Sequence, residues 1–184
     1  MMDELSLNIL DIAQNSIAAN AKLVEIDVEE DDAADSLVIR VKDDGKGMSE
    51  EFLRTVENPF VTTRTTRKIG LGISFMKEAA EITGGSFGIK SKLGAGTTLT
   101  AEFVKSHIDR QPLGDLTGTM VALVTLNPGV DFALRYKVNE NEFIFTTREV
   151  KEILGDEAEL NTPMVAAFLD EYIRENLDNL QGGA

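Results

Sequence analysis

The 184-residue chain contains no cysteine and no tryptophan, and it has a single histidine, His107. The absence of cysteine excludes disulfides, thiol catalysis and iron–sulfur clusters held by cysteine, and one histidine excludes histidine-rich metal centres. No apolar run reaches the ~18 residues that a membrane span requires. The N-terminus, Met-Met-Asp-Glu-Leu, lacks the cationic start of a signal peptide. We therefore expect a cytoplasmic protein that does not contact membranes.

Positive charge is also scarce. The chain has 18 Lys and Arg against 32 Asp and Glu, and its formal net charge is −14. Such a surface repels phosphate backbones, so nucleic acid is not an expected partner. Hydrophobic residues make up 42% of the chain, which is enough to build a sizeable core.

The hydrophobic periodicity predicts an α+β chain. Helices are expected over residues 4–20, 50–56, 72–82, 148–154 and 162–177, and strands over residues 23–28, 37–41, 86–91, 97–104, 120–126, 132–138 and 143–147. A polar stretch at 106–117 marks a boundary, so we predict two units, residues 1–105 and residues 106–184. The second unit, a β-hairpin with helices, either extends the sheet of the first or packs as a small C-terminal α+β appendage. Its core is expected to contain the aromatic residues Phe132, Tyr136, Phe143, Phe145, Phe168 and Tyr172. The alternative is that these aromatics form an exposed surface for a partner.

Four short segments follow one another within the first 98 residues of the chain. They are Asp11-x-x-x-Asn15, Asp43-Asp44-Gly45-Lys46-Gly47, Gly70-Leu71-Gly72 and Gly94-Ala95-Gly96-Thr97-Thr98. Taken singly, each is typical of an ordinary helix face or glycine turn. Together they supply carboxylates, a carboxamide and bare backbone amides, which are the groups that a nucleotide site requires.

Asp11 and Asn15 lie four residues apart on the first predicted helix, so they share one face. Asn15 could ligate Mg²⁺, which prefers oxygen ligands and needs only one or two from the protein. Asp11 is the candidate catalytic residue, because it could orient or deprotonate the water or hydroxyl that attacks the γ-phosphate. The alternative for this pair alone is an ordinary polar helix face.

Asp43 ends a predicted strand, where a buried carboxylate could accept a hydrogen bond from the N6 amine of adenine. Guanine presents a carbonyl at the matching position and would be repelled. Gly45 and Gly47 would let the backbone approach the base closely, and Thr97 could place its hydroxyl near Asp43 and the adenine edge. The alternative for the Asp43 segment is a β-turn, and the Gly94 segment by itself is typical of a hairpin turn.

Gly70-Leu71-Gly72 opens a predicted helix, whose N-terminal amides and partial positive charge suit a phosphate. The preceding stretch, residues 57–69, is basic and has no apolar period. Its cations, among them Arg64 and Lys68, could add counter-charge, and the stretch could close as a lid over the nucleotide. The alternative is a flexible, solvated loop.

In this order the segments resemble the ATPase domain shared by DNA gyrase B, the large heat-shock chaperones, sensor histidine kinases and mismatch-repair MutL, the GHKL or Bergerat-fold superfamily. Asp11 to Asn15 is similar to its N box, Asp43 to Gly47 to its first glycine box, Asn58-Pro59-Phe60 to its F box, and Gly70 to Ile73 to its second glycine box. The resemblance covers about residues 3–105 and is closest to histidine-kinase catalytic domains from Ile69 to Phe103. It implies a two-layer α/β sandwich, in which a mixed sheet carries helices on one face and Mg-ATP lies between those helices and a lid.

The resemblance also implies roles for single residues. Asn15 would be the Mg²⁺ ligand, Asp43 the adenine-reading residue, and Gly47 and Thr97 would line the base. Gly70-Leu71-Gly72 would hold phosphates.

The sequence departs from the superfamily pattern at two points. Asp11 is shorter than the Glu of hydrolysing members, and typical histidine kinases carry Asn there. No helical hairpin with a phosphoacceptor histidine precedes the first motif, so a self-phosphorylating sensor kinase is not expected. His107 is expected to be structural or at the surface.

We therefore expect an ATP-binding regulatory protein, in which slow hydrolysis of Mg-ATP would switch the lid and the C-terminal region for a protein partner. An alternative is a stand-alone protein kinase that phosphorylates His or Ser on a partner protein. The shortened Asp11 also allows a third possibility, a non-catalytic module with a relic pocket.

Overall fold

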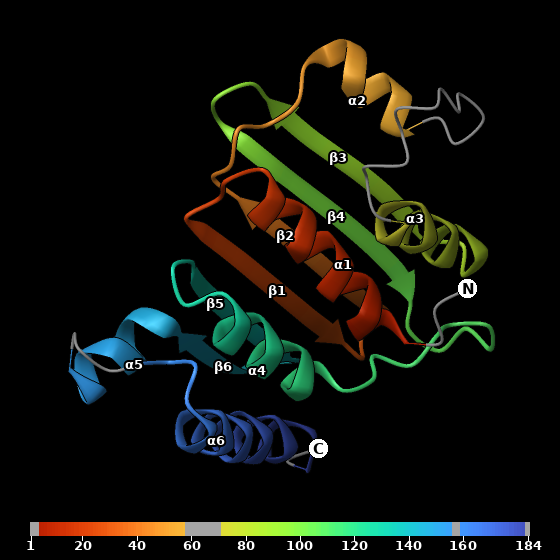
Figure 1. Ribbon diagram of the computed structural model, residues 1–184. Coiled ribbons are helices and arrows are strands. Elements are labelled where there is room, and N and C mark those ends of the chain that lie inside the picture. The colour runs from red at the N-terminus through yellow and green to blue at the C-terminus, as the bar shows by residue number, and fades with distance from the viewer. Residues whose placement is uncertain (1–3, 58–70, 156–158, 183–184) are drawn as a thin grey trace.

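The computed structural model describes residues 4–57, 71–155 and 159–182 (Figure 1). In chain order, the elements are α1 (Leu5–Ala18), β1 (Leu23–Asp31), β2 (Ser36–Asp43), α2 (Glu50–Glu57), α3 (Gly72–Ile82), β3 (Ser86–Lys92), β4 (Gly96–Val104), α4 (Leu116–Leu126), β5 (Asp131–Val138), β6 (Asn141–Thr146), α5 (Thr147–Leu154) and α6 (Pro163–Gly182).

The strands form one mixed sheet with the order β3-β4-β2-β1-β5-β6. Neighbouring strands are antiparallel except for β1 and β5, which run parallel with Leu23 opposite Asp131. Residues 106–184 therefore extend the sheet of the first half, which is one of the two arrangements that the sequence allowed. The mixed sheet of an α+β fold is confirmed.

Helices α3, α1, α4 and α6 lie side by side on one face of the sheet and form the second layer (Figure 1). Each helix in this row packs against the next, with α3 over β3 and β4 and α6 over β5 and β6. The core lies between the two layers. Its fully buried side chains come from both halves of the chain and include Ile9, Ile39, Met76, Phe103, Met120, Phe132, Tyr136 and Phe145.

The opposite face of the sheet carries ion pairs between neighbouring strands. Arg135 of β5 contacts Asp27 Oδ1 with Nη1 and Glu142 Oε2 with Nε, both at 2.9 Å, and Arg40 Nη1 lies 2.8 Å from Asp27 Oδ2. Exposed pairs of this kind contribute at most about 1 kcal/mol each. Their main consequence is that this face of the sheet is polar, in contrast to the face that packs against α3, α1, α4 and α6.

Residues 120–126 were predicted as a strand, and this prediction is wrong, because they form the second half of α4. Asp115 caps the start of the helix, because its side chain accepts a hydrogen bond from Gly118 N at 2.9 Å. Leu116, Met120, Leu123 and Val124 are its buried apolar residues, a helical spacing. Since α4 packs against α1, α6 and β5, the stretch is apolar on several sides, and a short apolar run does not reveal its period.

The aromatic residues predicted as the C-terminal core divide into two groups. Phe132, Tyr136, Phe143 and Phe145 are buried, whereas Phe168 and Tyr172 of α6 are 46% and 41% exposed. The prediction is wrong for the last two because α6 turns a different stripe inward. That stripe consists of Val165, Leu169, Ile173 and Leu177.

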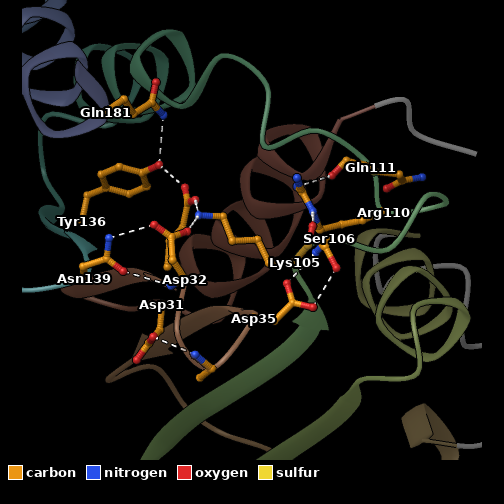
Figure 2. A network of polar contacts seen from close by, with 12 residues as sticks. Asp31, Asp32, Asp35, Lys105, Ser106, Arg110, Gln111, Tyr136, Asn139 and Gln181 are labelled. Carbon is orange, nitrogen blue, oxygen red and sulfur yellow. Dashed lines mark hydrogen bonds and ion pairs between the residues drawn. The ribbon is translucent and has the colours of Figure 1, made fainter. Parts of the chain in front are cut away.

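A polar network joins the β1–β2 turn, the end of β4 and the end of β5 (Figure 2). Lys105 Nζ lies 2.6 Å from Asp32 Oδ1 and 2.7 Å from Glu30 Oε2. Asn139, in the β5–β6 turn, donates from Nδ2 to Asp32 Oδ2 at 2.9 Å and accepts from Asp32 N at 2.9 Å. The network fixes the C-terminal hairpin against the first half of the chain.

Tyr136 extends this network to the last helix (Figure 2). Its hydroxyl donates to Glu30 and accepts a hydrogen bond from Gln181 Nε2 at 3.1 Å. Burial, reinforced by the hydrogen bond to Glu30, raises the pKa of the Tyr136 hydroxyl far above its ordinary value. The hydroxyl therefore remains a proton donor, and through it Gln181 of α6 is connected to Glu30 near the end of β1.

Candidate functional site

Helix α1 carries Asp11 and Asn15 and is held at both ends by segments distant in sequence. At its start, Leu5 N donates to Pro112 O at 3.0 Å and Ser6 N donates to Leu113 O at 2.8 Å. These carbonyls satisfy amides that would otherwise have no partner within the helix. Just beyond its end, Ala19 O accepts from Lys46 N at 2.9 Å. The position of α1 is thus set by the C-terminal half on one side and by the first glycine segment on the other.

The carboxylate of Asp43 lies at the end of β2 and is 9% exposed. Its Oδ2 accepts a hydrogen bond from Ser16 Oγ at 2.7 Å, and its Oδ1 accepts from Gly45 N at 2.9 Å. These two donors fix the orientation of the carboxylate. Because each carboxylate oxygen has two acceptor positions, Asp43 can still accept a hydrogen bond from a ligand.

Ser16, which contacts the Asp43 carboxylate, is not among the candidate residues predicted from the sequence. It is 4% exposed and lies on the buried stripe of α1 with Leu5, Ile9 and Ile12. A serine within an apolar stripe requires a buried hydrogen-bond partner, and this pattern is the signal that could have identified it.

The first glycine segment passes between the end of α1 and the β3–β4 turn. Lys46 donates to Ala19 O, and Lys46 O accepts from Gly94 N at 2.8 Å. Gly47 has a φ of 67°, and a Cβ there would lie 2.0 Å from Lys92 O. Only glycine fits this approach of two backbones, so the segment is built for close packing rather than for a simple turn.

Thr97 lies directly opposite Asp43 in the antiparallel pairing of β2 and β4, so both side chains point to the same face of the sheet. Its hydroxyl is 2.8 Å from Ser91 Oγ, which in turn accepts from Met48 N at 2.8 Å. Ser91 therefore links Thr97 to the glycine segment, a role that the sequence did not suggest. The structure brings together Asp43, Gly45, Gly47 and Thr97, the residues predicted to contact the base.

Asp11 meets the start of α3. Gly72 N donates to Asp11 Oδ2 at 2.6 Å, and a Cβ on Gly72 would lie 2.7 Å from the same oxygen. The partial positive charge of a helix N-terminus stabilises a carboxylate at this position. Leu71, just before α3, is 64% exposed. The short side chain of Asp11 thus reaches the second glycine segment.

Asn8 lies one turn before Asp11 on α1 and is completely buried. Neither its side-chain nitrogen nor its side-chain oxygen has a hydrogen-bond partner among the described residues. Such a group costs roughly 1–3 kcal/mol relative to its solvated state. The buried face of α1 near Asp11 is therefore more polar than core packing alone would require.

Other predicted groups lie outside the described residues. They are Asn58-Pro59-Phe60, Arg64, Lys68 and Gly70, so only Leu71 and Gly72 of the segment predicted to hold phosphates are described. In the part of the chain that the structure describes, no three His, Cys, Asp or Glu side chains gather in a way that could hold a metal ion. Mg²⁺ at the Asn15 carboxamide would then take its remaining ligands from phosphate oxygens and water, a set that this ion accepts.

Two further predictions concern His107 and membranes. His107 Nδ1 accepts a hydrogen bond from Asp109 N at 3.1 Å, and the side chain is 34% exposed, as expected for a structural or surface residue. Within residues 4–57, 71–155 and 159–182, no helix combines the length and apolarity needed to cross a bilayer.

The first part of the chain matches a known protein family and is similar to sensor proteins of bacteria. The family model described as "Histidine kinase-, DNA gyrase B-, and HSP90-like ATPase" matches residues 1–107. The sensor histidine kinase YvrG of Bacillus subtilis is 32% identical over 95 residues, which are 50% of this chain and 16% of that protein. The sensor protein SrrB of Staphylococcus aureus is 31% identical over 109 residues, 56% of this chain and 18% of that protein. The chain thus spans less than a fifth of the length of these relatives.

Solved structures show a similar fold. The Aquifex aeolicus MutL ATPase domain complexed with ADP has a TM-score of 0.51 at 16% identity, covering 84% of this chain and 70% of that one. The N-terminal domain of a DNA repair protein has a TM-score of 0.53 at 13% identity, covering 78% of this chain and 52% of that one. Each of these two alignments covers more of this chain than residues 1–107 alone could supply. The fold similarity therefore includes part of the C-terminal half.

Proposed function

Because the chain belongs to the histidine kinase-, DNA gyrase B- and HSP90-like ATPase family, we propose that it is an ATP-binding regulatory protein whose nucleotide state controls a protein partner. The observation that carries the proposal is the convergence of the four motif segments. Ser16 and Gly45 hold the Asp43 carboxylate, Thr97 lies opposite it, and Asp11 meets Gly72. The acidic surface also favours a protein as the partner over nucleic acid.

The base would be recognised at the Asp43 end of the site. Asp43 would accept a hydrogen bond from the N6 amine of adenine, and the same carboxylate would repel the carbonyl of guanine. Gly45 and Gly47, both buried and closely packed on neighbouring backbone, would form the wall against the base. Since Ser16 and Gly45 N fix the carboxylate in advance, little ordering is needed on binding.

The phosphates would lie at the start of α3, near Leu71, where the helix dipole and the N-terminal amides that Asp11 does not occupy favour anions. Mg²⁺, held in part by Asn15, would neutralise phosphate charge when bound. Gly72 N holds Oδ2 of Asp11, and this hydrogen bond leaves Oδ1 to orient a water or accept its proton. Slow hydrolysis is the reaction that this single carboxylate would support.

Titration calorimetry with Mg-ATP and Mg-GTP tests the proposal. The wild type should bind Mg-ATP and discriminate against Mg-GTP, and Asp43→Asn should weaken ATP binding about tenfold or more, since about 1.4 kcal/mol corresponds to tenfold. Asp44→Asn is the matched control, because Asp44 accepts hydrogen bonds from Lys22 N and Leu23 N instead of facing Ser16. Absence of binding heat for the wild type, or unchanged affinity in Asp43→Asn, would contradict the proposal.

The alternative is a stand-alone protein kinase that phosphorylates His or Ser on a partner protein. It is favoured by the similarity of about half of the chain to sensor histidine kinases. Labelled ATP mixed with candidate partners distinguishes the two functions. Transfer of label that Asn15→Ala abolishes would favour the kinase, whereas phosphate release without any labelled protein would favour the hydrolysing regulator.

A further inference from the structure

A row of apolar side chains lies exposed along α6. Met164 is 80% exposed, Phe168 46% and Tyr172 41%. They are spaced four residues apart, so they form one ridge on a helix whose buried stripe is made of other residues. Single exposed apolar residues are normal at a protein surface, but an aligned ridge of three large ones is typical of an interaction site.

The ridge continues onto the edge of the sheet through stacked rings. Phe168 and Tyr172 are nearly parallel, with ring centroids 5.8 Å apart, and Tyr172 meets Phe143 of β6 edge to face at 5.7 Å. Phe143 is 8% exposed, so the exposed rings stand on a buried one. These contacts hold the rings in one orientation, which lowers the entropy that binding would cost.

The C-terminal stretch of sequence that contains the ridge is strongly acidic. Residues 139–184 contain 11 Asp and Glu and 3 Lys and Arg, a balance of −8 within a chain of net charge −14. The three cations are already paired: Arg148 and Lys151 with Asp131, and Arg174 with Asp170 and Asp115. Glu171 and Glu175 follow Phe168 and Tyr172 by three residues, are exposed, and form no ion pair among the described residues. The edge of the ridge therefore carries uncompensated negative charge.

We propose that this α6–β6 face, formed by Met164, Phe168 and Tyr172 over Phe143, docks an amphipathic helix of a partner protein that carries Lys or Arg beside its apolar stripe. A ridge of residues four apart fits the groove of another helix, and basic flanks would complement Glu171 and Glu175. A second copy of this chain would bring its own acidic region against this one, and acidic lipid would be repelled. The inference rests on the proposed function in that it names the partner surface of the regulator.

The docking face and the nucleotide site lie at opposite ends of one helix layer. Helix α6 packs on α4, α4 on α1, and α1 on α3 (Figure 1). The partner helix would therefore bind without covering Asp43 or Gly72. Loss of docking in a variant of this face can consequently be distinguished from damage to the nucleotide site.

The probe is a synthetic amphipathic peptide of 18 residues with an apolar Leu and Phe stripe flanked by Lys. Its controls are a peptide of the same composition in scrambled order and a peptide with Glu in place of Lys. We expect saturable binding of the Lys peptide alone in calorimetry, with amide NMR shifts confined to α6 and β6. Met164→Ser and Phe168→Ser should each weaken binding about tenfold, as expected for anchors of an interface. Ile153→Ser, which removes a 79%-exposed apolar residue of α5, should not.

Several outcomes would overturn the proposal. The first is that the Lys peptide does not bind. The second is that the scrambled peptide binds as tightly as the Lys peptide. The third is that Met164→Ser and Phe168→Ser bind the Lys peptide as tightly as the wild type. A wild-type dimer in sedimentation that Phe168→Ser dissociates would identify a second copy as the occupant, and binding to phosphatidylcholine vesicles lost in the same variant would identify a membrane. Mg-ATP affinity, measured on every variant, should equal that of the wild type. If the wild type does not bind Mg-ATP, that result would instead count against the proposed function.

Discussion

Oδ2 of Asp11 accepts a hydrogen bond from Gly72 N at 2.6 Å, which joins the middle of α1 to the first residue of α3. The shorter Asp reaches because α3 begins directly beside α1, and the absence of a side chain on Gly72 permits the approach. The bond fixes the carboxylate at the helix N-terminus that would face phosphate. It makes Asp11 the residue on which turnover is expected to depend.

Asp11→Asn should abolish ATP turnover while leaving ATP binding largely intact. The amide oxygen of Asn can still accept from Gly72 N, so the local geometry is preserved, but the base is lost. A fall of about 100-fold or more in phosphate release is expected for loss of a general base. Asp44→Asn, which removes a carboxylate elsewhere, should retain turnover. If the wild type binds ATP without turnover and Asp11→Asn changes nothing measurable, the chain is a non-catalytic module. Turnover that Asp11→Asn leaves unchanged would contradict the role of Asp11 as the base.

Ser16→Ala should weaken ATP binding because Asp43 loses the hydroxyl that orients it. The expected loss of affinity is about five- to tenfold, corresponding to a net hydrogen bond of about 1–1.5 kcal/mol. Ser6→Ala is the matched control, since Ser6 is an equally buried serine of α1 that bonds Glu4 instead. Calorimetry on both variants checks the prediction, and equal affinities for the two would refute a role of Ser16 in the site.

Gly96→Ala and Gly94→Ala should differ in cost although both glycines have positive φ, 86° and 77°. A Cβ on Gly96 would lie 1.9 Å from Asp43 O, whereas a Cβ on Gly94 would meet nothing within 4 Å. Gly94→Ala should therefore cost only the left-handed strain of about 1–2 kcal/mol. Gly96→Ala should cost about 3 kcal/mol or more and displace Asp43. Urea unfolding measures both losses, and equal losses would contradict the close approach of β2 to this turn.

Asp44 should contribute to stability in a pH-dependent way. Its hydrogen bond from Leu23 N, reinforced by one from Lys22 N, holds the pKa of the Asp44 carboxyl below its ordinary value. A depressed folded pKa means that the contribution is complete above the unfolded pKa of about 3.9 and is lost as pH falls through the folded pKa. Asp44→Asn should thus be less stable than the wild type at pH 7, and the difference should shrink as pH falls below about 4. Urea unfolding at a series of pH values checks this, and a constant difference would contradict it.

Most helices and strands could be predicted from the sequence because periodicity reports which face of a segment is buried. Residues 72–82 form a helix as predicted, and β5 and β6 follow the predicted hairpin. The failures have a common cause. The stretch that forms α4 packs on several elements at once, so its apolar residues do not show a clear helical period. Helix α6 carries more apolar side chains than its inner stripe can bury.

By itself, the sequence determined the order of the motifs, the family and the local elements, since these depend on residues close together in the chain. Tertiary structure decided which distant residues meet. It placed Ser16 against Asp43, Asp11 against Gly72, β5 beside β1, and Phe168 and Tyr172 at the surface. The physical reason is that a periodic pattern encodes the need to bury a face but not the partner against which it is buried, and that partner is chosen by packing across the whole sheet.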